Sequence, residues 1–503
     1  MDRRSFLKTG TQAAVAGTVA SAATRPASTK AVHGAVESTP AISLLRDFSE
    51  EEHRRRLQNI ARCTQSIRST MREHLITEYL PGQCCYNLGE YPSTQPWFVD
   101  EYDEQELDRL QSEGIEVLQV FDDWNDSLRL FGGDKYSAVN PQGYHRFIEL
   151  AHARGMKVLT YTSTCFIQRS DPDFKQEWSR EGDFLQVGYW DMARCSPASP
   201  GWRAFVMQKF ARIMEEYGTD GIYVDGGYLS NQHAYKQTMP VAPDEIVAFE
   251  ETAEHDGAFA DMLALIYDDV KRRGGILKLH VNAAEKPMAK SLATYDYLWV
   301  GEGVKQVDPL REAVKDYAPY LVPCIDMGFT QVETEDEPYL HAIPYMQFPV
   351  SMGGRIFTGE RGFVPGVTYK DDFWMQRCRD AWKQYQEDPT KLHTYSAWDA
   401  VPGSPNTRIN HAKWLKRYRP LVQPGTKAYL EIADSDFFTT PLPEGVVVSA
   451  FANQELHLVV ANYGRSPVDV TLADPWKADD ADSPASVYTL APRSLRILQR
   501  VTT

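Results

Sequence analysis

The sequence predicts a parallel (β/α)8 barrel, a TIM barrel, followed by a C-terminal antiparallel β-sandwich domain. Between about residues 80 and 400, short apolar or β-branched runs alternate with helical stretches, and about eight such runs occur. Several helical stretches end at a glycine, which favours a helix C-terminus. Beyond residue 425, short alternating runs separated by turn residues replace the helical pattern. Repeated strand and helix units are typical of a parallel barrel, and a doubly wound open sheet is the alternative.

The length of the chain indicates more than one folded unit. A single hydrophobic core rarely supports more than about 250–300 residues, and this chain has 503. The charge and apolar spacing of residues 51–75 are those of an exposed helix. The expected division is a signal peptide and linker over 1–45, a helical N-terminal extension over 46–79, the barrel over 80–415 and the β-sandwich over 425–503.

Each predicted strand is an apolar run bounded by turn residues. The predicted barrel strands cover 83–89, 115–124, 156–164, 220–227, 276–283, 295–303, 320–326 and, least clearly, 353–359. The predicted sandwich strands cover 445–453, 456–464, 467–473, 485–491 and 494–501.

The N-terminus predicts export. Arg3 and Arg4 precede a weakly apolar Ala/Gly/Val/Thr run, and "ASA" at 20–22 offers a small-residue cleavage site. This order of segments resembles a bacterial twin-arginine signal, and a disordered basic tail is the alternative. No other segment approaches the ~18–20 consecutive apolar residues of a membrane span. We therefore expect a soluble mature protein in the periplasm or outside the cell.

Composition argues against several classes of partner and cofactor. The net charge is −16, from 69 acidic and 53 basic side chains, and the basic residues are dispersed. Nucleic acid binding relies on clustered Lys and Arg, so it is not expected. The seven cysteines include no C-x-x-C, and the histidines lack metal-ligand spacing, so we predict neither a metal nor another cofactor. The sequence does not assign disulfide pairs.

Asp225 is the first candidate catalytic residue. It ends the fourth predicted strand in "GIYVDGG", on the same strand face as Tyr223, and two glycines follow it. Catalytic residues of a parallel barrel lie at the C-terminal ends of strands. The alternative is that Asp225 caps the next helix.

Glu302 is the second candidate catalytic residue. It follows the sixth predicted strand and is flanked by Gly301 and Gly303. A solvated loop glutamate is the alternative. Two carboxylates at the ends of different barrel strands form the pair that a glycosidase needs, one ionised and one protonated.

The fifth predicted strand, "ILKLHVNA", has a polar face. Lys278, His280 and Asn282 alternate with apolar residues, so the three side chains share one face. Buried polar groups need partners, and a ligand at the barrel mouth would provide them. An internal hydrogen-bond network is the alternative, especially for Lys278.

The second predicted strand ends in an acidic and aromatic cluster. Asp122, Asp123 and Trp124 suit a sugar, because carboxylates accept hydroxyl hydrogen bonds and an indole stacks on a pyranose. A tight acidic turn with a packed tryptophan is equally consistent with these residues. Further candidates for substrate contact are Tyr223, Trp299 and Arg355.

The segment "CSPASPGWRAFVMQKFARIMEEYGTDGIYVDGG" (195–227) resembles the approach to the fourth barrel strand in bacterial glycoside hydrolases of the α-galactosidase and α-glucosidase clan, including hypothetical glycosyl hydrolases. The resemblance implies an Asp nucleophile ending the fourth strand, matching Asp225, and an acid/base ending the sixth, matching Glu302. It also implies a C-terminal β-sandwich. The α-galactosidase relatives have K-x-D where this chain has Tyr223, Val224 and Asp225, and usually Asp where it has Glu302. A glutamate on strand six resembles the endo-α-N-acetylgalactosaminidase type instead.

Together these features predict an exported retaining glycoside hydrolase that acts on α-linked glycans or glycosides by double displacement. The expected partner is therefore a carbohydrate substrate. A non-catalytic carbohydrate-binding protein on a glycosidase-like barrel is the main alternative. A carbohydrate lyase or epimerase that uses the same carboxylates for proton transfer is another.

Overall fold

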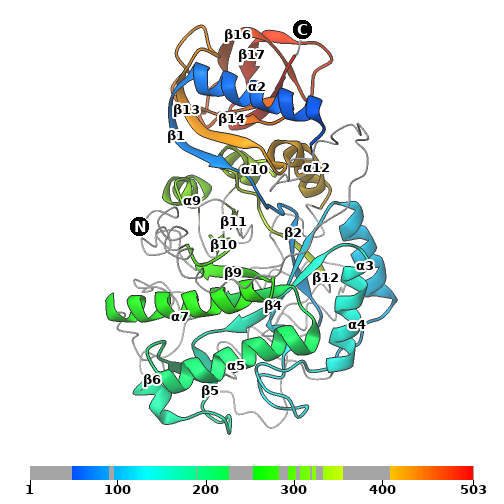
Figure 1. The fold of residues 1–503 in the computed structure, drawn as a ribbon, viewed down its shortest axis with the longest axis vertical. Coiled ribbons are helices and arrows are strands. Elements are labelled where there is room, and N and C mark those ends of the chain that lie inside the picture. Colours follow the sequence, from blue (N-terminus) through cyan, green and yellow to red (C-terminus); the bar gives the residue numbers. More distant parts are fainter. Residues whose placement is uncertain are drawn as a thin grey trace, which may run out of the picture. The chain divides into compact units, whose positions relative to one another are not determined.

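A computed structural model of the chain describes residues 48–89, 96–187, 190–225, 253–281, 293–301, 306–317, 320–323, 332–354 and 408–501. Figure 1 shows the ribbon with its helices and strands labelled. The described residues all belong to one compact unit that begins at Phe48.

Eight of the described strands form a parallel barrel. Its strands are β2 (Gln83–Asn87), β3 (Val117–Val120), β4 (Lys157–Ser163), β8 (Gly221–Asp225), β9 (Ile276–Val281), β10 (Tyr297–Val300), β11 (Leu321–Pro323) and β12 (Ser351–Gly354). They are neighbours in chain order, and β12 returns to pair with β2. The amide of Val350 donates to the carbonyl of Pro323 at 3.1 Å, which joins the ends of β11 and β12. Eight parallel strands in this order confirm the predicted (β/α)8 fold.

Among the described residues, a helix lies between most pairs of successive barrel strands. These helices are α3 (Glu101–Ser112), α4 (Pro141–His152), α5 (Pro200–Tyr217), α7 (Ala253–Arg272), α9 (Val307–Val314) and α10 (Glu337–Ala342), and α12 (Arg408–Tyr418) follows the barrel. Local sequence explains their ends. Asp100 forms a capping box with Asp103, Ser199 caps a helix that begins with proline, and Gly218 ends that helix at φ 68°. Figure 1 shows α5 and α7, which contact each other, lying side by side.

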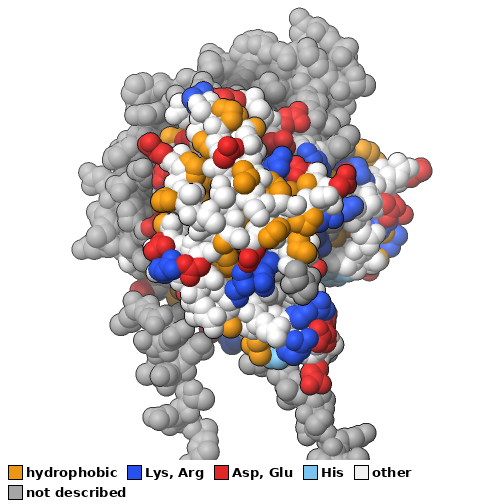
Figure 2. Space-filling view, turned by 90° about the horizontal axis from the view of Figure 1, so that it is seen from above, with side chains coloured by type: hydrophobic (Ala, Val, Ile, Leu, Met, Phe, Trp, Pro, Cys, Tyr) orange, Lys and Arg blue, Asp and Glu red, His pale blue; other side chains and the backbone are white. Residues whose placement is uncertain are grey.

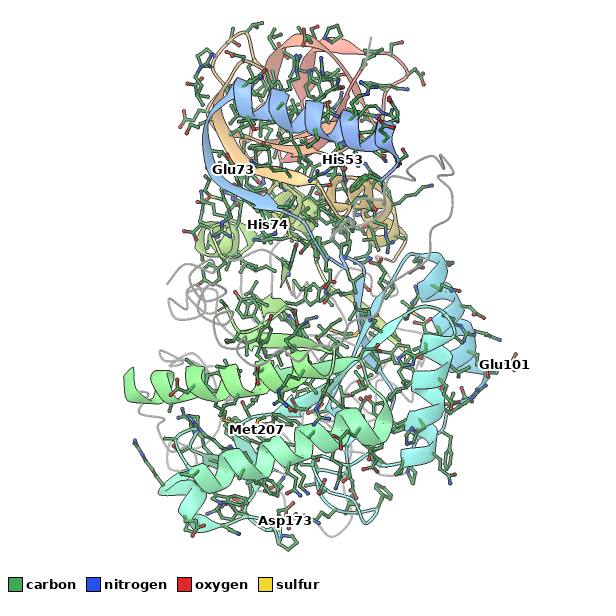
Figure 3. The ribbon with its side chains drawn as sticks, in the orientation of Figure 1. His53, Glu73, His74, Glu101, Asp173 and Met207 are labelled. Carbon is green, nitrogen blue, oxygen red and sulfur yellow. The ribbon has the colours of Figure 1, made fainter. Side chains whose placement is uncertain are left out.

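A small antiparallel sheet follows the third barrel strand and was not predicted from the sequence. It contains β5 (Phe166–Gln168), β6 (Ser179–Val187) and β7 (Trp190–Cys195), in the order β5-β7-β6. Arg129, in the loop after β3, donates to Asp171 at 2.8 Å and to Asp173 at 2.6 Å. Asp173 is labelled in Figure 3. The small sheet therefore contacts the loop after β3, which lies at the same, C-terminal end of the barrel strands.

The C-terminal module is antiparallel, as predicted. Its seven described strands follow the order β1-β13-β14-β15-β18-β16-β17. They are β1 (Ile67–Leu75), β13 (Lys427–Ser435), β14 (Val446–Ala452), β15 (Leu456–Asn462), β16 (Val468–Ala478), β17 (Ala485–Leu490) and β18 (Ser494–Arg500). The long strand β16 pairs with β17 through one part and with β18 through another. Residues of β13 to β18 share one hydrophobic core.

The expected helix over residues 51–75 is only partly correct. Helix α2 (Glu50–Ser66) is capped by Ser49, and residues 67–75 form strand β1 instead. This strand pairs with β13, which lies more than 350 residues later in the chain. The pairing satisfies the backbone groups of β1 and overrides its local helical pattern.

Side-chain contacts connect the C-terminal module to the barrel. The hydroxyl of Ser449 donates to the carbonyl of Pro344 at 2.7 Å, and the hydroxyl of Tyr463 donates to that of Leu340 at 3.0 Å. On β1, His74 lies 3.2 Å from the hydroxyl of Tyr320, which precedes barrel strand β11. His74 and its neighbour Glu73 are labelled in Figure 3. The first described strand therefore contacts both modules.

The surface carries mixed charge. In Figure 2, blue and red side chains both occur on the visible described face, and neither colour forms a continuous stripe. Among the described helices, none has the length and apolar character needed to cross a membrane.

Candidate active site

Asp225 is the last residue of β8, the fourth strand of the barrel. Its Oδ2 accepts a hydrogen bond from the Tyr161 hydroxyl at 2.9 Å, and its Oδ1 lies 2.8 Å from Nδ1 of His280. Tyr161 lies on β4 and His280 on β9, the two neighbours of β8. The side chain is 19% exposed. Among the described residues, side chains of both flanking strands therefore orient the carboxylate, while it stays accessible to solvent.

The same strand end is fixed through its backbone. The amide of Thr164, just after β4, donates to the carbonyl of Asp225 at 3.1 Å, and Ser163 pairs with Asp225 in the sheet. At the opposite end of β8, Asp220 accepts from the amide of Val158 at 2.8 Å and contacts His152 at 2.7 Å. Asp220 thus lies at the strand-entry side of β8. The two carboxylates that flank β8 occupy opposite ends of the barrel.

His280, Tyr223 and Trp299 form an aromatic layer inside the barrel beneath Asp225. The ring of His280 lies nearly parallel to that of Trp299, with centroids 5.4 Å apart, and also to that of Tyr223, at 6.0 Å. The centroids of Tyr223 and Trp299 are 5.1 Å apart. All three side chains are buried. Tyr223 and Trp299, expected to contact substrate, are therefore placed to support His280, and the structure shows no exposed ring face on either.

Lys278 lies within the barrel and is fully buried. Its ammonium donates to Oε1 of Gln83 at 3.0 Å and lies 5.2 Å from the centre of the Trp299 ring. A buried charge needs such partners. The internal network, left open by the sequence as the alternative, describes Lys278, and its expected role in substrate binding is not supported.

Asp123 and Trp124 belong to a short 3-10 helix (Asp122–Trp124) that follows β3. Asp123 is buried, and its Oδ2 accepts from the amides of Leu88 and Gly89 at 2.6 and 2.9 Å. It therefore fastens the loop after β2.

Trp124 is 0% exposed. Its indole donates to the carbonyl of Tyr161 at 3.0 Å, and its ring stacks on Tyr144 at 5.2 Å. A fully packed indole has no free face for a sugar, so the expectation that Trp124 stacks on substrate is corrected to a packing role. Asp122, by contrast, is only partly buried.

Three other predicted site residues, Asn282, Glu302 and Arg355, lie outside the described residues. Gly301, immediately before Glu302, has φ +97°, a conformation that favours glycine. The roles of Asn282, Glu302 and Arg355 stay predictions.

Sequence reasoning missed Tyr161 and Lys135. Tyr161 occupies an inward position of the predicted third strand, so strand alternation alone could have revealed it. Lys135 lies in an irregular loop, where no periodic pattern points to a buried lysine. It is 7% exposed, and its ammonium donates to the carbonyl of Phe166 at 2.8 Å. Burial lowers the pKa of Lys135, and the carboxylates of Asp122 and Asp225 oppose that shift.

Among the described residues, no group of three His, Cys, Asp or Glu side chains is arranged to hold a metal ion. The chemistry that the described site offers is that of an accessible, oriented carboxylate. Such a group can act as a nucleophile or as a base.

No protein-family model matches the chain, and no curated protein matches it. Similar solved structures include a noncanonic maltogenic α-amylase, AmyB, from Thermotoga neapolitana, at 12% identity and a TM-score of 0.48 over 85% of this chain and 100% of that one. The α-amylase of Geobacillus thermoleovorans is 12% identical, with a TM-score of 0.47 over 85% of this chain and 100% of that one.

The trehalulose synthase MutB of Pseudomonas mesoacidophila is 10% identical, with a TM-score of 0.48 over 84% of this chain and 99% of that one. At such identities and TM-scores, these similarities define neither a family nor an activity for this chain. The fold assignment rests on the strand order described above, and the clan suggested by residues 195–227 stays a prediction.

Proposed function

We propose that this protein is a retaining glycoside hydrolase that acts on α-linked glycans or glycosides. Asp225 is its nucleophile and Glu302 its acid/base. The observation that carries the proposal is the placement of Asp225 at the C-terminal end of the fourth barrel strand, with Tyr161 and His280 each contacting one carboxylate oxygen. Catalytic groups of parallel barrels occupy this end of the strands.

In the first step, Asp225 attacks the anomeric carbon while Glu302 protonates the departing oxygen, which gives a covalent glycosyl-enzyme. In the second step, Glu302 takes a proton from water, and the water displaces Asp225. The hydrogen bonds from Tyr161 and His280 hold the carboxylate in one orientation, which favours attack along a single direction.

The substrate contacts in this proposal come from residues at the mouth of the barrel. Asp122 is partly buried and follows β3 at the C-terminal end of the barrel strands, and in this proposal its carboxylate accepts hydrogen bonds from hydroxyl groups of the substrate. Asn282 and Arg355 come directly after barrel strands β9 and β12 in the sequence, and the proposal assigns them further substrate contacts. The choice of α-linked substrates is supported by the resemblance of residues 195–227.

We also propose that the protein is exported through its twin-arginine segment. Replacing Arg3 and Arg4 together by lysine should leave the protein in the cytoplasm of a bacterial host, whereas the unchanged chain should reach the periplasm or medium. Equal export of both forms would contradict this part of the proposal. Cell fractionation followed by immunoblotting provides the measurement.

The test of the hydrolase proposal is a panel of α-linked oligosaccharides and aryl α-glycosides incubated in H2(18)O. Hydrolysis places one heavy oxygen in the new reducing end, whereas a lyase gives an unsaturated product and an epimerase releases nothing. Asp225→Asn should lower the rate by about 10³-fold or more, because the nucleophile of the covalent route is lost.

Asp220→Asn is the matched control, because Asp220 flanks the same strand at the opposite end of the barrel. It should retain most of the activity. Glycan binding without hydrolysis, unaffected by Asp225→Asn, would instead identify a carbohydrate-binding protein and overturn the proposal.

A further inference from the structure

His341, on helix α10, is a buried histidine at the contact between the barrel and the C-terminal module. It is only 5% exposed. Its Nδ1 lies 3.1 Å from a guanidinium nitrogen of Arg311, on α9. Its Nε2 lies 3.1 Å from a guanidinium nitrogen of Arg493, in the turn that joins β17 to β18. Both ring nitrogens therefore face a cationic group, one from a barrel helix and one from the C-terminal module.

These two contacts restrict the protonation of the imidazole. A guanidinium group only donates hydrogen bonds, and a neutral imidazole accepts at one of its two nitrogens. In either neutral tautomer, His341 can therefore accept from one arginine while its own N–H group faces the other. A protonated imidazole accepts from neither arginine, and it adds a third positive charge to the two guanidinium groups. The folded geometry thus favours the neutral form of His341.

The carboxylates nearest to His341 already bind the two arginines. Arg493 donates to Asp308 at 2.8 Å and to Glu337 at 2.8 Å, and Arg311 donates to the same Asp308 at 3.1 Å. An oxygen of Asp308 lies 3.9 Å from Nε2 of His341, which is too far for a hydrogen bond. Two cations and two carboxylates therefore balance each other while the imidazole is neutral, and a proton on His341 disturbs that balance.

Other groups beside the cluster do not supply the missing negative charge. Glu312 of α9 accepts from Arg311 at 2.7 Å and pairs with Lys315 at 2.8 Å, and Lys315 lies 3.5 Å from Glu431 of β13. These carboxylates therefore have cationic partners of their own.

Tyr463 of the C-terminal module packs against the cluster with its ring. The ring centre lies 3.7 Å from the guanidinium carbon of Arg311 and 5.3 Å from the centre of the imidazole. Burial and the positive charge of Arg311 lower the pKa of His341 from its ordinary value of about 6.5, and Asp308 only partly opposes this shift.

We propose that His341 is an acid-sensitive switch: protonation of its imidazole, beside the guanidinium groups of Arg311 and Arg493, opens the contact of the C-terminal module with α9 and α10. In the open form, water surrounds the imidazole and His341 takes up a proton freely. The contact is therefore complete above about pH 6.5, and each pH unit below that value favours the open form by up to about tenfold. The switch does not depend on the proposed hydrolase activity.

Hydrogen–deuterium exchange of the full chain, read by peptide mass spectrometry, measures this opening. Exchange is followed at several pH values between about 7 and 4.5, and each rate is divided into the intrinsic rate of the unfolded chain at that pH to give a protection factor. We expect protection of α9, α10 and the turn that carries Arg493 to fall by about tenfold or more over this range. Peptides from barrel strands β3 and β4 should keep their protection.

His341→Gln tests the switch directly, because glutamine does not titrate and its side-chain oxygen can still accept from an arginine. Its α9 and α10 peptides should keep their protection at low pH. His457→Gln is the matched control. His457 is a buried histidine of the C-terminal module, on β15, and its Nε2 lies 3.6 Å from Glu455. This variant should show the same local loss of protection as the wild type.

Three results would overturn the inference. The first is protection of α9 and α10 that does not change with pH in the wild type. The second is a wild-type pH response in folded His341→Gln, or an equal loss of that response in His457→Gln. The third is a simultaneous loss of protection in all peptides, which would indicate global acid unfolding instead of a local opening. If His341→Gln does not fold, His341→Asn takes its place under the same criteria.

Discussion

Nδ1 of His280 lies 2.8 Å from Oδ1 of Asp225, and the two residues belong to adjacent parallel strands. The imidazole is buried and packs against the rings of both Tyr223 and Trp299. This packing restricts the direction in which Nδ1 points, so the contact fixes one carboxylate oxygen. Tyr161 fixes the other from the opposite side. The barrel thus presents Asp225 as a pre-oriented group at its C-terminal end.

His280→Phe should weaken catalysis without unfolding the barrel. Phenylalanine keeps a planar ring packed against Tyr223 and Trp299 but removes the contact with Asp225. A hydrogen bond to a charged group contributes about 1.5–3 kcal/mol, so we expect kcat/KM to fall by about 10–100-fold. Tyr161→Phe, which removes the partner of the other oxygen, is the parallel variant. Steady-state kinetics at one pH provides the measurement, and activity equal to wild type in both variants would contradict an orienting role.

Trp124→Phe tests whether the indole of Trp124 packs in the core or binds substrate. The replacement removes the hydrogen bond to Tyr161 and part of a buried ring, so the free energy of unfolding should fall by about 1–3 kcal/mol. KM should change by no more than about twofold, because Trp124 offers no surface to a sugar. Urea unfolding and substrate kinetics on the same variant provide the two numbers. A large rise in KM with unchanged stability would restore the sugar-stacking interpretation.

Arg493 of the C-terminal module contacts two acidic side chains of the barrel helices. It donates to Asp308 of α9 at 2.8 Å and to Glu337 of α10 at 2.8 Å, and Glu337 is only 1% exposed. Arg493→Met leaves that buried carboxylate without its cation, so we expect a loss of about 3–5 kcal/mol in unfolding free energy. The double variant Arg493→Met/Glu337→Gln should recover much of the loss, because it removes the uncompensated charge. Equal stability of Arg493→Met and the wild type would show that the hydrogen bonds of Arg493 to Asp308 and Glu337 do not stabilise the fold.

Buried histidines make the fold sensitive to acid. Burial lowers the pKa of His411 and of His457 from 6.5 to about 4. Between pH 6.5 and pH 4 the two histidines bind protons in the unfolded chain but not in the folded protein. Their contribution to the free energy of unfolding is therefore complete above pH 6.5 and decreases as the pH falls toward 4. Each histidine contributes a slope of up to about 1.4 kcal/mol per pH unit in this range.

Urea unfolding at several pH values between 7 and 4.5 measures how steeply the free energy of unfolding changes with pH. His457→Gln should reduce this slope by about one proton equivalent. A slope identical to that of the wild type would show that His457 does not contribute to acid sensitivity.

The sequence predicted the features of this fold that follow local patterns. Apolar runs bounded by glycines located the barrel strands, and the run 220–227 placed Asp225 at the end of the fourth strand, as observed. Features that depend on distant partners were not visible. Strand β1 has a local helical pattern, and its pairing partner β13 lies far along the chain.

The sequence also did not show which residues of a given type are exposed and which are buried. The cluster of Asp122, Asp123 and Trp124 looks like a polar turn in either case, and only the fold shows that Asp123 and Trp124 are buried. Lys135 lies in an irregular loop without periodicity, so its burial depends entirely on tertiary contacts with β5. Strand alternation could have identified Tyr161, because it faces inward on the predicted third strand.

The most direct test of the central claim is to trap the glycosyl-enzyme. The protein is incubated with a 5-fluoro α-glycosyl fluoride, whose fluorine slows the second step more than the first, and is then digested and analysed by peptide mass spectrometry. We predict one added glycosyl group per chain, on the peptide that contains Asp225, and none in Asp225→Asn. A substrate that is hydrolysed without such an adduct, or an adduct on another carboxylate, would contradict the assignment of Asp225 as the nucleophile.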